Sequence, residues 1–423
     1  MDHFQQRGGA LHAEEVSLEA LADAVGTPAY VYSTATMVRH VRIFREALAA
    51  IPDPLIAFAV KSNPNLSVLR TLAREGVGAD VVSEGEMRRA LAAGIPPQRI
   101  IFSGVGKTRA EMAAALLAGI HQLNVESEAE LHALSEVAGA LGLQAAIALR
   151  VNPDVDAGTL AKISTGKREN KFGIPDDQVE ALYARAAALP GIAPMGLAVH
   201  IGSQISSLAP LEAACRRLGE LIGALRAAGL PVSRADLGGG LGIPYDPSLP
   251  APPPPSAYGE MVARVTKGWN VRLAFEPGRL IVGNAGILLS RVVAVKPGAT
   301  RTFVILDAAM NDLIRPTLYG VFHDVRAVRP RPGRTIATLV GPVCESGDQF
   351  AEDREVTPLE AGDLVALMSA GAYGATMAST YNSRPLVPEV LVNGGEWAVV
   401  RPRQTYEELL GQDRIAPWLE EQA

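Results

Sequence analysis

Short apolar runs alternate with longer amphipathic stretches between residues 35 and 285. Runs that are apolar throughout are typical of parallel strands, because such strands are covered on both faces. Eight strands are predicted: Leu55–Val60, Ala79–Val82, Arg99–Phe102, Gln122–Val125, Ala145–Val151, Gly196–Ile201, Arg234–Leu237 and Val271–Phe275. The stretches between them predict helices, among them Glu84–Ala93, Arg109–Ala118, Glu128–Leu141, Asp176–Ala188 and Leu211–Ala228. Eight βα units in about 250 residues indicate a (β/α)₈ TIM-like barrel, with an open doubly wound sheet as the alternative.

The pattern changes after about residue 285, where apolar runs follow one another with turns and few helical stretches. This indicates an all-β C-terminal domain. Its predicted strands are Gly286–Val295, Thr302–Leu306, Thr335–Val340, Asp363–Met368 and Val387–Val392. The short run Tyr30-Val31-Tyr32 precedes the barrel pattern, and we expect it to pair with the β domain. The expected organisation is therefore an N-terminal segment over residues 1–34, a barrel over 35–285 and a β domain over 286–423.

Charge and cysteine content narrow the range of partners and compartments. The net charge is −6, and the 39 lysines and arginines are spread along the chain, which argues against nucleic acid or an anionic membrane as a partner. No apolar stretch is long enough to span a bilayer, and residues 1–7 lack the apolar core of a signal peptide. Two cysteines, Cys215 and Cys344, are too few for a disulfide framework. We expect a cytoplasmic protein, and no metal site is assigned.

Polar residues follow several of the predicted barrel strands, where a barrel presents its reactive groups. Lys61 ends the first strand, and partial burial of its amine would make it a nucleophile toward carbonyls; a solvated lysine is the alternative. His200 follows the sixth strand and either stacks on a flat ring or is an ordinary buried histidine.

The seventh and eighth strands end in a glycine cluster and a charged motif. Gly238-Gly239-Gly240 can expose N–H groups to a phosphate, or can be a flexible turn. In Glu276-Pro277-Gly278-Arg279 the carboxylate suits a protonated ring nitrogen and the arginine a substrate carboxylate, although a surface ion pair is the alternative. Lysine, phosphate cradle, carboxylate and imidazole on one face together indicate a pyridoxal 5'-phosphate site.

With these motifs the chain resembles the fold-type III pyridoxal-phosphate decarboxylases, and within them the diaminopimelate decarboxylase family. The resemblance extends from about Thr27 to about Glu408. It is carried by Phe58-Ala59-Val60-Lys61-Ser62-Asn63, Lys171-Phe172-Gly173-Ile174, His200-Ile201-Gly202-Ser203-Gln204, Leu237-Gly238-Gly239-Gly240-Leu241-Gly242, Glu276-Pro277-Gly278-Arg279, Gly341-Pro342-Val343-Cys344-Glu345-Ser346-Gly347-Asp348 and Gly371-Ala372-Tyr373-Gly374.

The resemblance implies a role for each matching residue. Lys61 resembles the lysine that binds the cofactor covalently, Glu276 the partner of the pyridine nitrogen and His200 the residue stacked on the ring. The implied phosphate cradle comprises Ser203, Gly238, Gly239 and Gly240, closed by the segment Pro277, Gly278 and Arg279. Substrate-binding positions are matched by Arg279, Arg315 and Tyr319, and Tyr373 matches a residue that touches both cofactor and substrate.

Cys344 and Glu345 resemble a pair that the other subunit of a head-to-tail homodimer contributes in this family. The resemblance then implies that Cys344 is the proton donor and that Glu345 binds the distal ammonium of the substrate. The alternative for Cys344 is a small buried thiol.

The implied reaction is decarboxylation of meso-2,6-diaminopimelate to L-lysine and carbon dioxide, the last step of lysine biosynthesis. A related decarboxylase of ornithine, arginine or carboxynorspermidine is the nearest competing reading, but these substrates have no distal carboxylate for an arginine pair to hold. Two further candidates are an amino-acid racemase and a catalytically inactive cofactor carrier. Glu276 opposite the ring nitrogen argues against the racemase, and the Cys344-Glu345 pair argues against the carrier.

Overall fold

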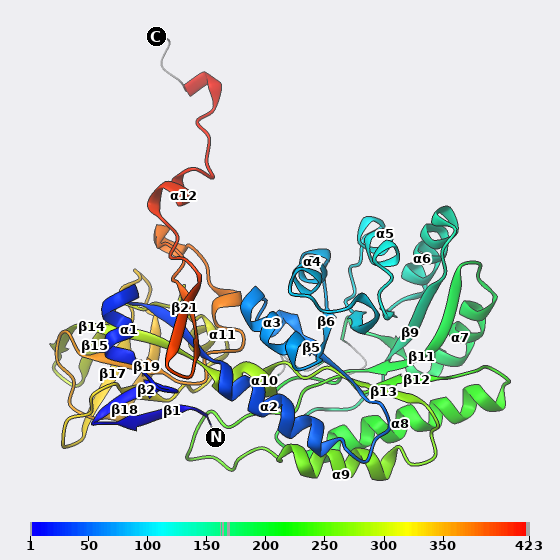
Figure 1. Ribbon diagram of the computed structural model, residues 1–423, viewed down its shortest axis with the longest axis horizontal. Coiled ribbons are helices and arrows are strands. Elements are labelled where there is room, and N and C mark those ends of the chain that lie inside the picture. Colours follow the sequence, from blue (N-terminus) through cyan, green and yellow to red (C-terminus); the bar gives the residue numbers. More distant parts are fainter. Residues whose placement is uncertain (1, 161, 163–164, 167–169, 420–423) are drawn as a thin grey trace. The chain divides into compact units, whose positions relative to one another are not determined.

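The computed structural model describes residues 2–160, 162, 165–166 and 170–419. The chain forms two compact units (Figure 1). One comprises Thr34–Asn284, and the other joins the N-terminal Met1–Ser33 to Ala285–Ala423.

The unit 34–284 is a closed parallel barrel. Its strands are β5 (Leu55–Ala59), β6 (Gly78–Val81), β7 (Ile100–Phe102), β8 (Gln122–Val125), β9 (Ala145–Asn152), β11 (Ile192–Val199), β12 (Arg234–Asp236) and β13 (Arg272–Phe275). They pair in parallel, β13 next to β5 and β8 next to β9, so the sheet closes on itself, and the short β10 (Ile174–Pro175) adds to β9. Inward-facing Leu55, Ala57, Ile101 and Ala274 pack together within it. The closure confirms the barrel and excludes the open sheet.

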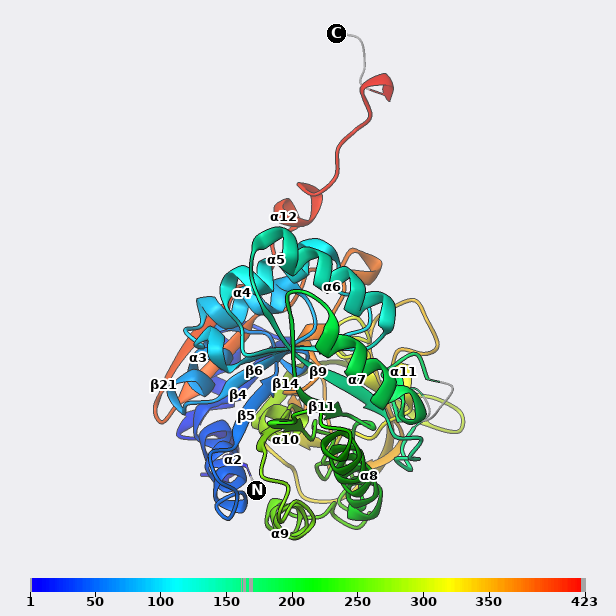
Figure 2. The ribbon, with the colours of Figure 1, turned by 90° about the vertical axis from the view of Figure 1, so that its right-hand side faces the viewer.

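Helices lie around the barrel strands (Figure 2). They are α2 (Thr34–Ala47), α3 (Leu66–Arg74), α4 (Glu84–Ala92), α5 (Arg109–Ala118), α6 (Glu128–Leu141), α7 (Val179–Ala188), α8 (Leu208–Ala227), α9 (Pro255–Val265) and the short α10 (Arg279–Val282).

Local sequence explains where these helices begin and end. The Thr108 hydroxyl accepts from the Glu111 N–H, and the Glu111 carboxylate accepts from the Thr108 N–H, which makes a capping box at the start of α5. Ser127 caps α6 in a similar way, and Gly142 ends that helix with a φ of 63°.

The other unit is built on a sheet in the order β18-β17-β15-β14-β4-β20-β21. The strands are β4 (Ala29–Ser33), β14 (Gly286–Pro297), β15 (Thr302–Leu306), β17 (Thr335–Val340), β18 (Gln349–Val356), β20 (Glu389–Asn393) and β21 (Glu396–Arg401), with β19 (Leu364–Leu367) paired to β14 and β16 (Val325–Ala327) to β19. The N-terminal strand β4 lies between β14 and β20, antiparallel to the first and parallel to the second. The predicted pairing of the N-terminal strand with the β domain is therefore confirmed.

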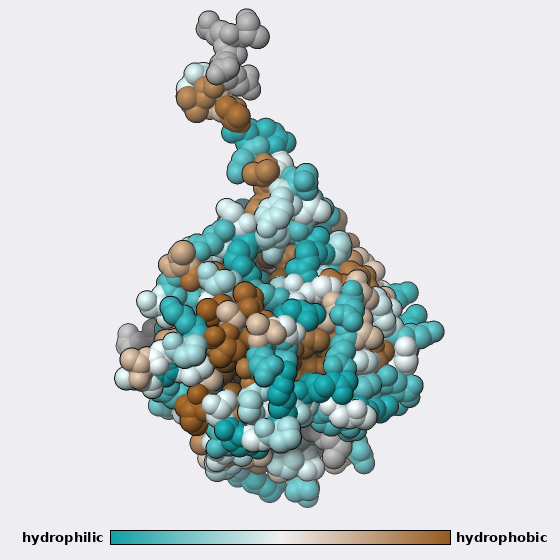
Figure 3. Space-filling view, turned by 90° about the vertical axis from the view of Figure 1, so that its left-hand side faces the viewer, coloured by the Kyte–Doolittle hydropathy of each residue, from teal (hydrophilic) through white to brown (hydrophobic). Residues whose placement is uncertain are grey.

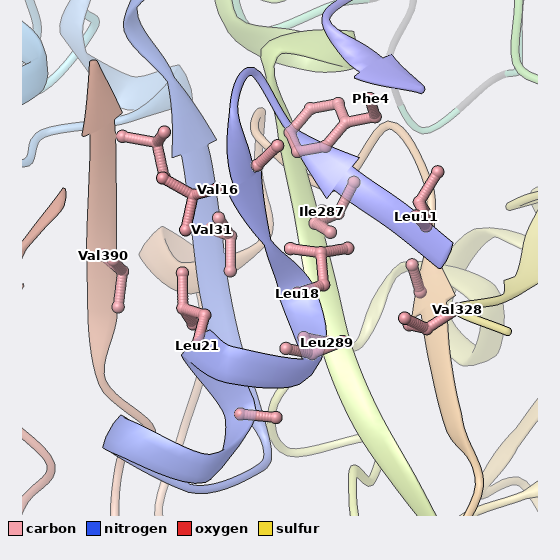
Figure 4. Close-up of a cluster of buried hydrophobic side chains, with 14 of the residues drawn as sticks. Phe4, Leu11, Val16, Leu18, Leu21, Val31, Ile287, Leu289, Val328 and Val390 are labelled. Carbon is pink, nitrogen blue, oxygen red and sulfur yellow. The ribbon is translucent and has the colours of Figure 1, made fainter. Parts of the chain in front are cut away.

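The N-terminal segment also supplies a cover for this sheet. A small sheet of β1 (Phe4–Arg7), β2 (Ala10–Ala13) and β3 (Val16–Ser17) leads into helix α1 (Leu18–Val25). Figure 4 shows the side chains of Phe4, Leu18 and Leu21 against Ile287 and Val390 of the large sheet. All five side chains are buried, so the hydrophobic effect holds the N-terminal segment on the sheet.

The surface of the β unit in Figure 3 mixes hydrophilic residues with hydrophobic patches. Val293 and Ile336 are more than half exposed, and so are Tyr406 and Trp418 in the segment after β21, which includes the short helix α12 (Tyr406–Leu410). Within the described part of the chain, every helix is too short or too polar to cross a bilayer.

The substitution of Gly259 in α9 tests how closely α9 packs against the end of α2. A Cβ atom at this position would lie 1.9 Å from the backbone oxygen of Ala47, at the end of α2. We expect Gly259→Ala to lower the free energy of unfolding by roughly 1–3 kcal/mol, because neither backbone can move away without disturbing the packing of the two helices. Denaturant unfolding measures the change.

The matched control is Gly223→Ala in α8, where an added Cβ meets nothing within 4 Å. There alanine should stabilise the helix by about 0.5–1 kcal/mol. Equal effects of the two substitutions would contradict the packing argument.

Candidate active site

A cavity of about 420 Å³ opens at the carboxyl ends of the barrel strands. The residues that line it include Lys61, Ser103, Asn124, Arg150, His200, Asp236 and Glu276. Three of them lie in β8, β9 and β12, and the other four follow directly after β5, β7, β11 and β13. This is the face on which barrel enzymes build their sites.

Lys61 lies in a single 3₁₀ turn, Val60–Ser62, directly after β5. Its Nζ donates to Oδ2 of Asp80 at 2.6 Å. Asp80 is opposite Ala59 in the pairing of β5 with β6, and it is fully buried, whereas the lysine side chain is one third exposed. The carboxylate therefore fixes the amine at the cavity while leaving one side of it accessible.

The glycine cluster follows β12 and is packed tightly against its neighbours. Gly238 and Gly240 have φ angles of 65° and 106°, which disfavour other residues. A Cβ on Gly239 would lie 2.2 Å from the Glu276 carbonyl oxygen, and one on Gly240 would lie 2.5 Å from the Gly202 carbonyl oxygen. This glycine cradle, Gly238–Gly240, therefore packs against the backbone of Glu276 and Gly202 more closely than side chains would allow.

Glu276 follows β13, and its carboxyl group is buried in the barrel. Its backbone N–H donates to the Gly238 carbonyl at 2.7 Å, which ties the residue to the cradle. Burial raises the pKa of Glu276 well above its ordinary value, and the carboxylates of Asp236 and Asp80 raise it further. The shift favours the protonated form of Glu276 in the chain alone.

His200 follows β11 and is held at both its backbone and its ring. Its Nδ1 accepts from the Gly239 N–H at 3.2 Å, and its carbonyl accepts from the Thr165 hydroxyl at 2.8 Å. Burial lowers the pKa of His200 well below its usual value, and the charges of Arg150 and Lys61 act in the same direction. The ring is neutral, with its proton on Nε2.

The segment after Glu276 brings Pro277, Gly278 and Arg279 next to β5 and to the loop after β11. The Pro277 carbonyl accepts from the Ala59 N–H at 3.2 Å, and a Cβ on Gly278 would touch Ala59 and Ser62 at 3.0–3.2 Å. Arg279 is nearly buried, and its guanidinium donates to Oγ of Ser203 at 3.1 Å and to the Tyr245 hydroxyl at 2.6 Å.

An ion-pair network stiffens the opposite wall of the cavity. Glu126 accepts from Arg150 at 2.9 Å, from the Gly104 N–H at 2.7 Å and from the Gly173 N–H at 3.2 Å. The buried Lys107 pairs with Glu130 at 2.7 Å and also donates to the Gly104 carbonyl. These contacts join the ends of three neighbouring strands.

In the β unit, Cys344 and Glu345 lie exposed on the loop between β17 and β18. The Cys344 N–H donates to Oδ1 of Asn382 at 3.2 Å, and the Tyr381 hydroxyl donates to the Glu345 carboxylate at 3.0 Å. The buried Asp348 accepts from the N–H groups of Val343 and Met310, which anchors the base of the loop. The loop therefore presents its thiol and carboxylate on a fixed frame.

The same unit holds Arg315, Tyr319 and Tyr373. Arg315 and Tyr319 begin and end the short helix α11 (Arg315–Tyr319), and the guanidinium of Arg315 is buried and donates to the Ala372 carbonyl at 3.4 Å. Tyr373, next in the chain, has a φ of 56°, an unfavourable conformation for a large side chain that is common at functional sites.

The barrel thus brings together the predicted residues from Lys61 to Arg279, and the β unit holds the other five. Sequence reasoning missed Asp80, Asp236 and Arg150, which the structure places at the cavity or on its lysine. A signal was present for each, since all three are charged residues inside predicted apolar strands. A buried charge needs a partner, and that requirement marks a functional site.

The barrel residues fit pyridoxal phosphate. The glycine turn after β12 suits a phosphate-binding loop, because its backbone packs closer to Glu276 and Gly202 than side chains would allow, and the Lys61 side chain is one third exposed at the cavity. The raised pKa of the buried Glu276 favours a protonated carboxyl group, which suits a ring nitrogen, and the neutral His200 suits the face of an aromatic ring.

Comparison with known proteins gives the family. Residues 34–283 match the family model of the pyridoxal-dependent decarboxylases, pyridoxal binding domain. A diaminopimelate decarboxylase of Zymomonas mobilis is 54% identical over 98% of this chain and 99% of its own.

Two solved structures are similar along nearly their whole length. The diaminopimelate decarboxylase of M. jannaschii in complex with L-lysine has a TM-score of 0.95 at 32% identity and covers 99% of both chains. The Helicobacter pylori diaminopimelate decarboxylase, also with L-lysine, has a TM-score of 0.90 at 38% identity over 93% of this chain and 98% of its own. The chain belongs to the diaminopimelate decarboxylase family of pyridoxal-dependent decarboxylases.

Proposed function

We propose that the chain decarboxylates meso-2,6-diaminopimelate at its D-configured centre, giving L-lysine and carbon dioxide with pyridoxal 5'-phosphate as cofactor. The supporting observation is that Lys61, His200 and Glu276 line one cavity. The chain that holds this cavity is 54% identical to a diaminopimelate decarboxylase. Production of L-lysine would make this the last step of lysine biosynthesis.

In this proposal the barrel holds the cofactor. Lys61 binds it covalently, Gly238, Gly239 and Gly240 with Ser203 receive its phosphate, and Pro277, Gly278 and the backbone of Arg279 close that cradle. His200 packs on the ring of the cofactor, and Glu276 bonds the ring nitrogen. Tyr373, a residue of the β unit, contacts the cofactor as well. When bound, pyridoxal phosphate supplies an electron sink for the pair left behind by the departing carboxylate.

The residues of this chain then bind the substrate and deliver a proton. Arg279 and Arg315 are suited to a carboxylate because the guanidinium forks onto two oxygens, and Tyr319 supports them. Glu345 binds the distal ammonium. Cys344 donates a proton to the α-carbon of the substrate after the carboxylate has left.

We further propose a head-to-tail homodimer in which Cys344 and Glu345 serve the partner's site. The exposure of both side chains on an anchored loop supports this assignment. The same thiol supports a reducing compartment, the cytoplasm, because an exposed cysteine that must donate a proton has to stay unoxidised.

The test of the reaction is an assay of the purified protein with four substrates in parallel. Diaminopimelate should release carbon dioxide and yield L-lysine, whereas ornithine, arginine and carboxynorspermidine should not react, because they offer no distal carboxylate to an arginine. Turnover of ornithine without turnover of diaminopimelate would contradict the proposal. Inversion of an amino acid without carbon dioxide would identify a racemase instead.

Gly240→Ala tests the phosphate cradle. The new methyl group would lie 2.5 Å from the Gly202 carbonyl oxygen, at a φ of 106°. We expect cofactor binding to weaken by roughly 1–3 kcal/mol, about 5- to 150-fold in Kd, because the loop must shift out of its phosphate-binding shape. Absorbance titration of the cofactor-free chain with pyridoxal phosphate measures it.

Gly139→Ala is the control, since an added Cβ on this α6 residue meets nothing within 4 Å. It should bind the cofactor with unchanged affinity. If the Gly240→Ala chain and the control bound pyridoxal phosphate with equal affinity, the assignment of the glycine cradle to the phosphate would be contradicted.

A further inference from the structure

Asp236 is a second buried carboxyl group next to Glu276, and the proposed reaction assigns it no part. It is the last residue of β12, is 1% exposed and lines the same cavity. Asp236 lies opposite Ala274, two residues before Glu276, in the pairing of β12 with β13, and each carboxyl group shifts the pKa of the other. Neighbouring buried carboxyl groups favour keeping a proton on one of them, because two like charges in a buried site repel each other.

The surrounding donors decide which carboxyl group keeps that proton. Oδ1 of Asp236 accepts from the Gly238 N–H at 2.9 Å, and Oδ2 accepts from Nδ2 of Asn124 at 3.1 Å. The Asn124 amide is oriented in turn, since its Oδ1 accepts from Nε2 of Gln122 at 2.8 Å. Both Asp236 oxygens thus accept from fixed donors, which stabilises the carboxylate.

Glu276 has no comparable set of donors in the described structure. Ser103 lies 3.5 Å from its Oε1, at the limit of a hydrogen bond. Burial raises the pKa of Glu276, with Asp236 and Asp80 adding to the effect, whereas hydrogen bonds from Glu276, Gly238 and Asn124 oppose the effect of burial on the pKa of Asp236. The shared proton therefore belongs on Glu276.

The charges around the pair support the same distribution. Asp80 is paired with Lys61, and Arg150 is paired with Glu126. His200 faces the cavity as a neutral ring. With Asp236 ionised, a further charge on Glu276 would leave two buried carboxylates without a cation of their own.

We propose that Asp236 is a positioning residue which, held ionised by Gly238 and Asn124, keeps a proton on Glu276 ready for the ring nitrogen of the cofactor. The inference rests on the proposed function. On binding, the proton moves from the Glu276 carboxyl oxygen to the ring nitrogen, and Glu276 becomes the carboxylate opposite it. No proton is taken from solvent for the ring.

Proton counting during cofactor binding tests this. The full-length chain, freed of cofactor with hydroxylamine, is titrated with pyridoxal phosphate in a calorimeter at slightly alkaline pH, in buffers of different ionisation enthalpy. In Asp236→Asn, Glu276 loses one of the carboxylates that raise its pKa, so a larger fraction of Glu276 is ionised beforehand and the chain should take up more protons per site than the unmodified chain, by up to about one. Equal uptake by the two chains, with the cofactor bound in both, overturns the proposal.

Infrared spectroscopy of the cofactor-free chain tests where the proton lies, whether or not the cofactor binds. The unmodified chain should show a carboxylic-acid C=O band that Glu276→Gln removes and that Asp236→Asn loses at lower pH. Asn124→Ala keeps both carboxyl groups and deprives Asp236 of a donor, so the band should persist to higher pH. It also serves if Asp236→Asn does not fold.

Each outcome of the infrared test separates the two possible locations of the proton. A band that survives Glu276→Gln but vanishes in Asp236→Asn would place the proton on Asp236 and sink the inference. Ser135→Ala, which removes a buried hydroxyl bonded to the Pro190 carbonyl, is the control and should leave the band unchanged. A chain that shows the expected band but binds no pyridoxal phosphate would refute the proposed function and leave the location of the proton established.

Discussion

Lys61→Ala is expected to abolish decarboxylation, with a loss of more than about 10³-fold in kcat, because Lys61 carries the one amine among the described residues that line the cavity. The absorbance band of bound cofactor should disappear with it. In the unmodified protein, borohydride should trap the cofactor on one lysine, and peptide mapping should identify that lysine as Lys61, whose amine is held at the cavity by Asp80.

Lys267→Ala is the matched control, since Lys267 is exposed on the barrel unit. It should retain the absorbance band and the activity. If borohydride labelled another lysine in the unmodified protein, the assignment of Lys61 would fail, even with activity lost in Lys61→Ala.

Cys344→Ala should lower kcat by about 10²–10⁴-fold, the usual contribution of a positioned proton donor, and leave the absorbance of the bound cofactor unchanged. Steady-state kinetics and a spectrum of the same sample measure the two effects. Cys215→Ala is the control, because Cys215 is buried in α8 and burial raises the pKa of its thiol to about 12, which keeps it inert. Unchanged activity of Cys344→Ala would exclude this thiol as the donor.

Mixing the two inactive chains tests whether the thiol serves the partner's site. In a mixed dimer of Lys61→Ala and Cys344→Ala, the subunit that retains Lys61 would receive an intact Cys344 from its partner. Refolding the chains together should therefore restore part of the activity, whereas refolding each alone should restore none. Failure of complementation in a verified mixed dimer would place Lys61 and Cys344 of one chain in one site.

The barrel could be predicted because each of its strands is a buried apolar run. All eight strands were found, with Gln122–Val125 in full and most others within one residue. The largest error was at β11, which begins at Ile192 and not at Gly196; its pairing with β9 shifts in register between Pro194 and Gly196. In the β unit the prediction missed the small sheet of β1, β2 and β3 and the strands β16, β18 and β21. The edge strands β18 and β21 carry charged residues that break the apolar pattern.

The polar residues at the ends of the barrel strands could be identified in the sequence as candidate site residues. The side chains that they contact could not be derived from it. Asp80 contacts Lys61 because β5 lies next to β6, and Asp236 meets Asn124 across the barrel. Such contacts depend on strand order, register and inward orientation together. Likewise, the attachment of Cys344 to Asn382 joins loops 38 residues apart and leaves no pattern in the sequence.

The position of β4 has a consequence for how the protein is made. Residues 29–33 leave the ribosome before the barrel, whereas the strands on either side of them, β14 and β20, begin at residues 286 and 389. The contiguous barrel can fold while the chain is still being synthesised, but β4 gains its first neighbouring strand only with β14 and its second only with β20. Until then the nascent chain carries an apolar strand with open edges, the kind of segment that chaperones bind.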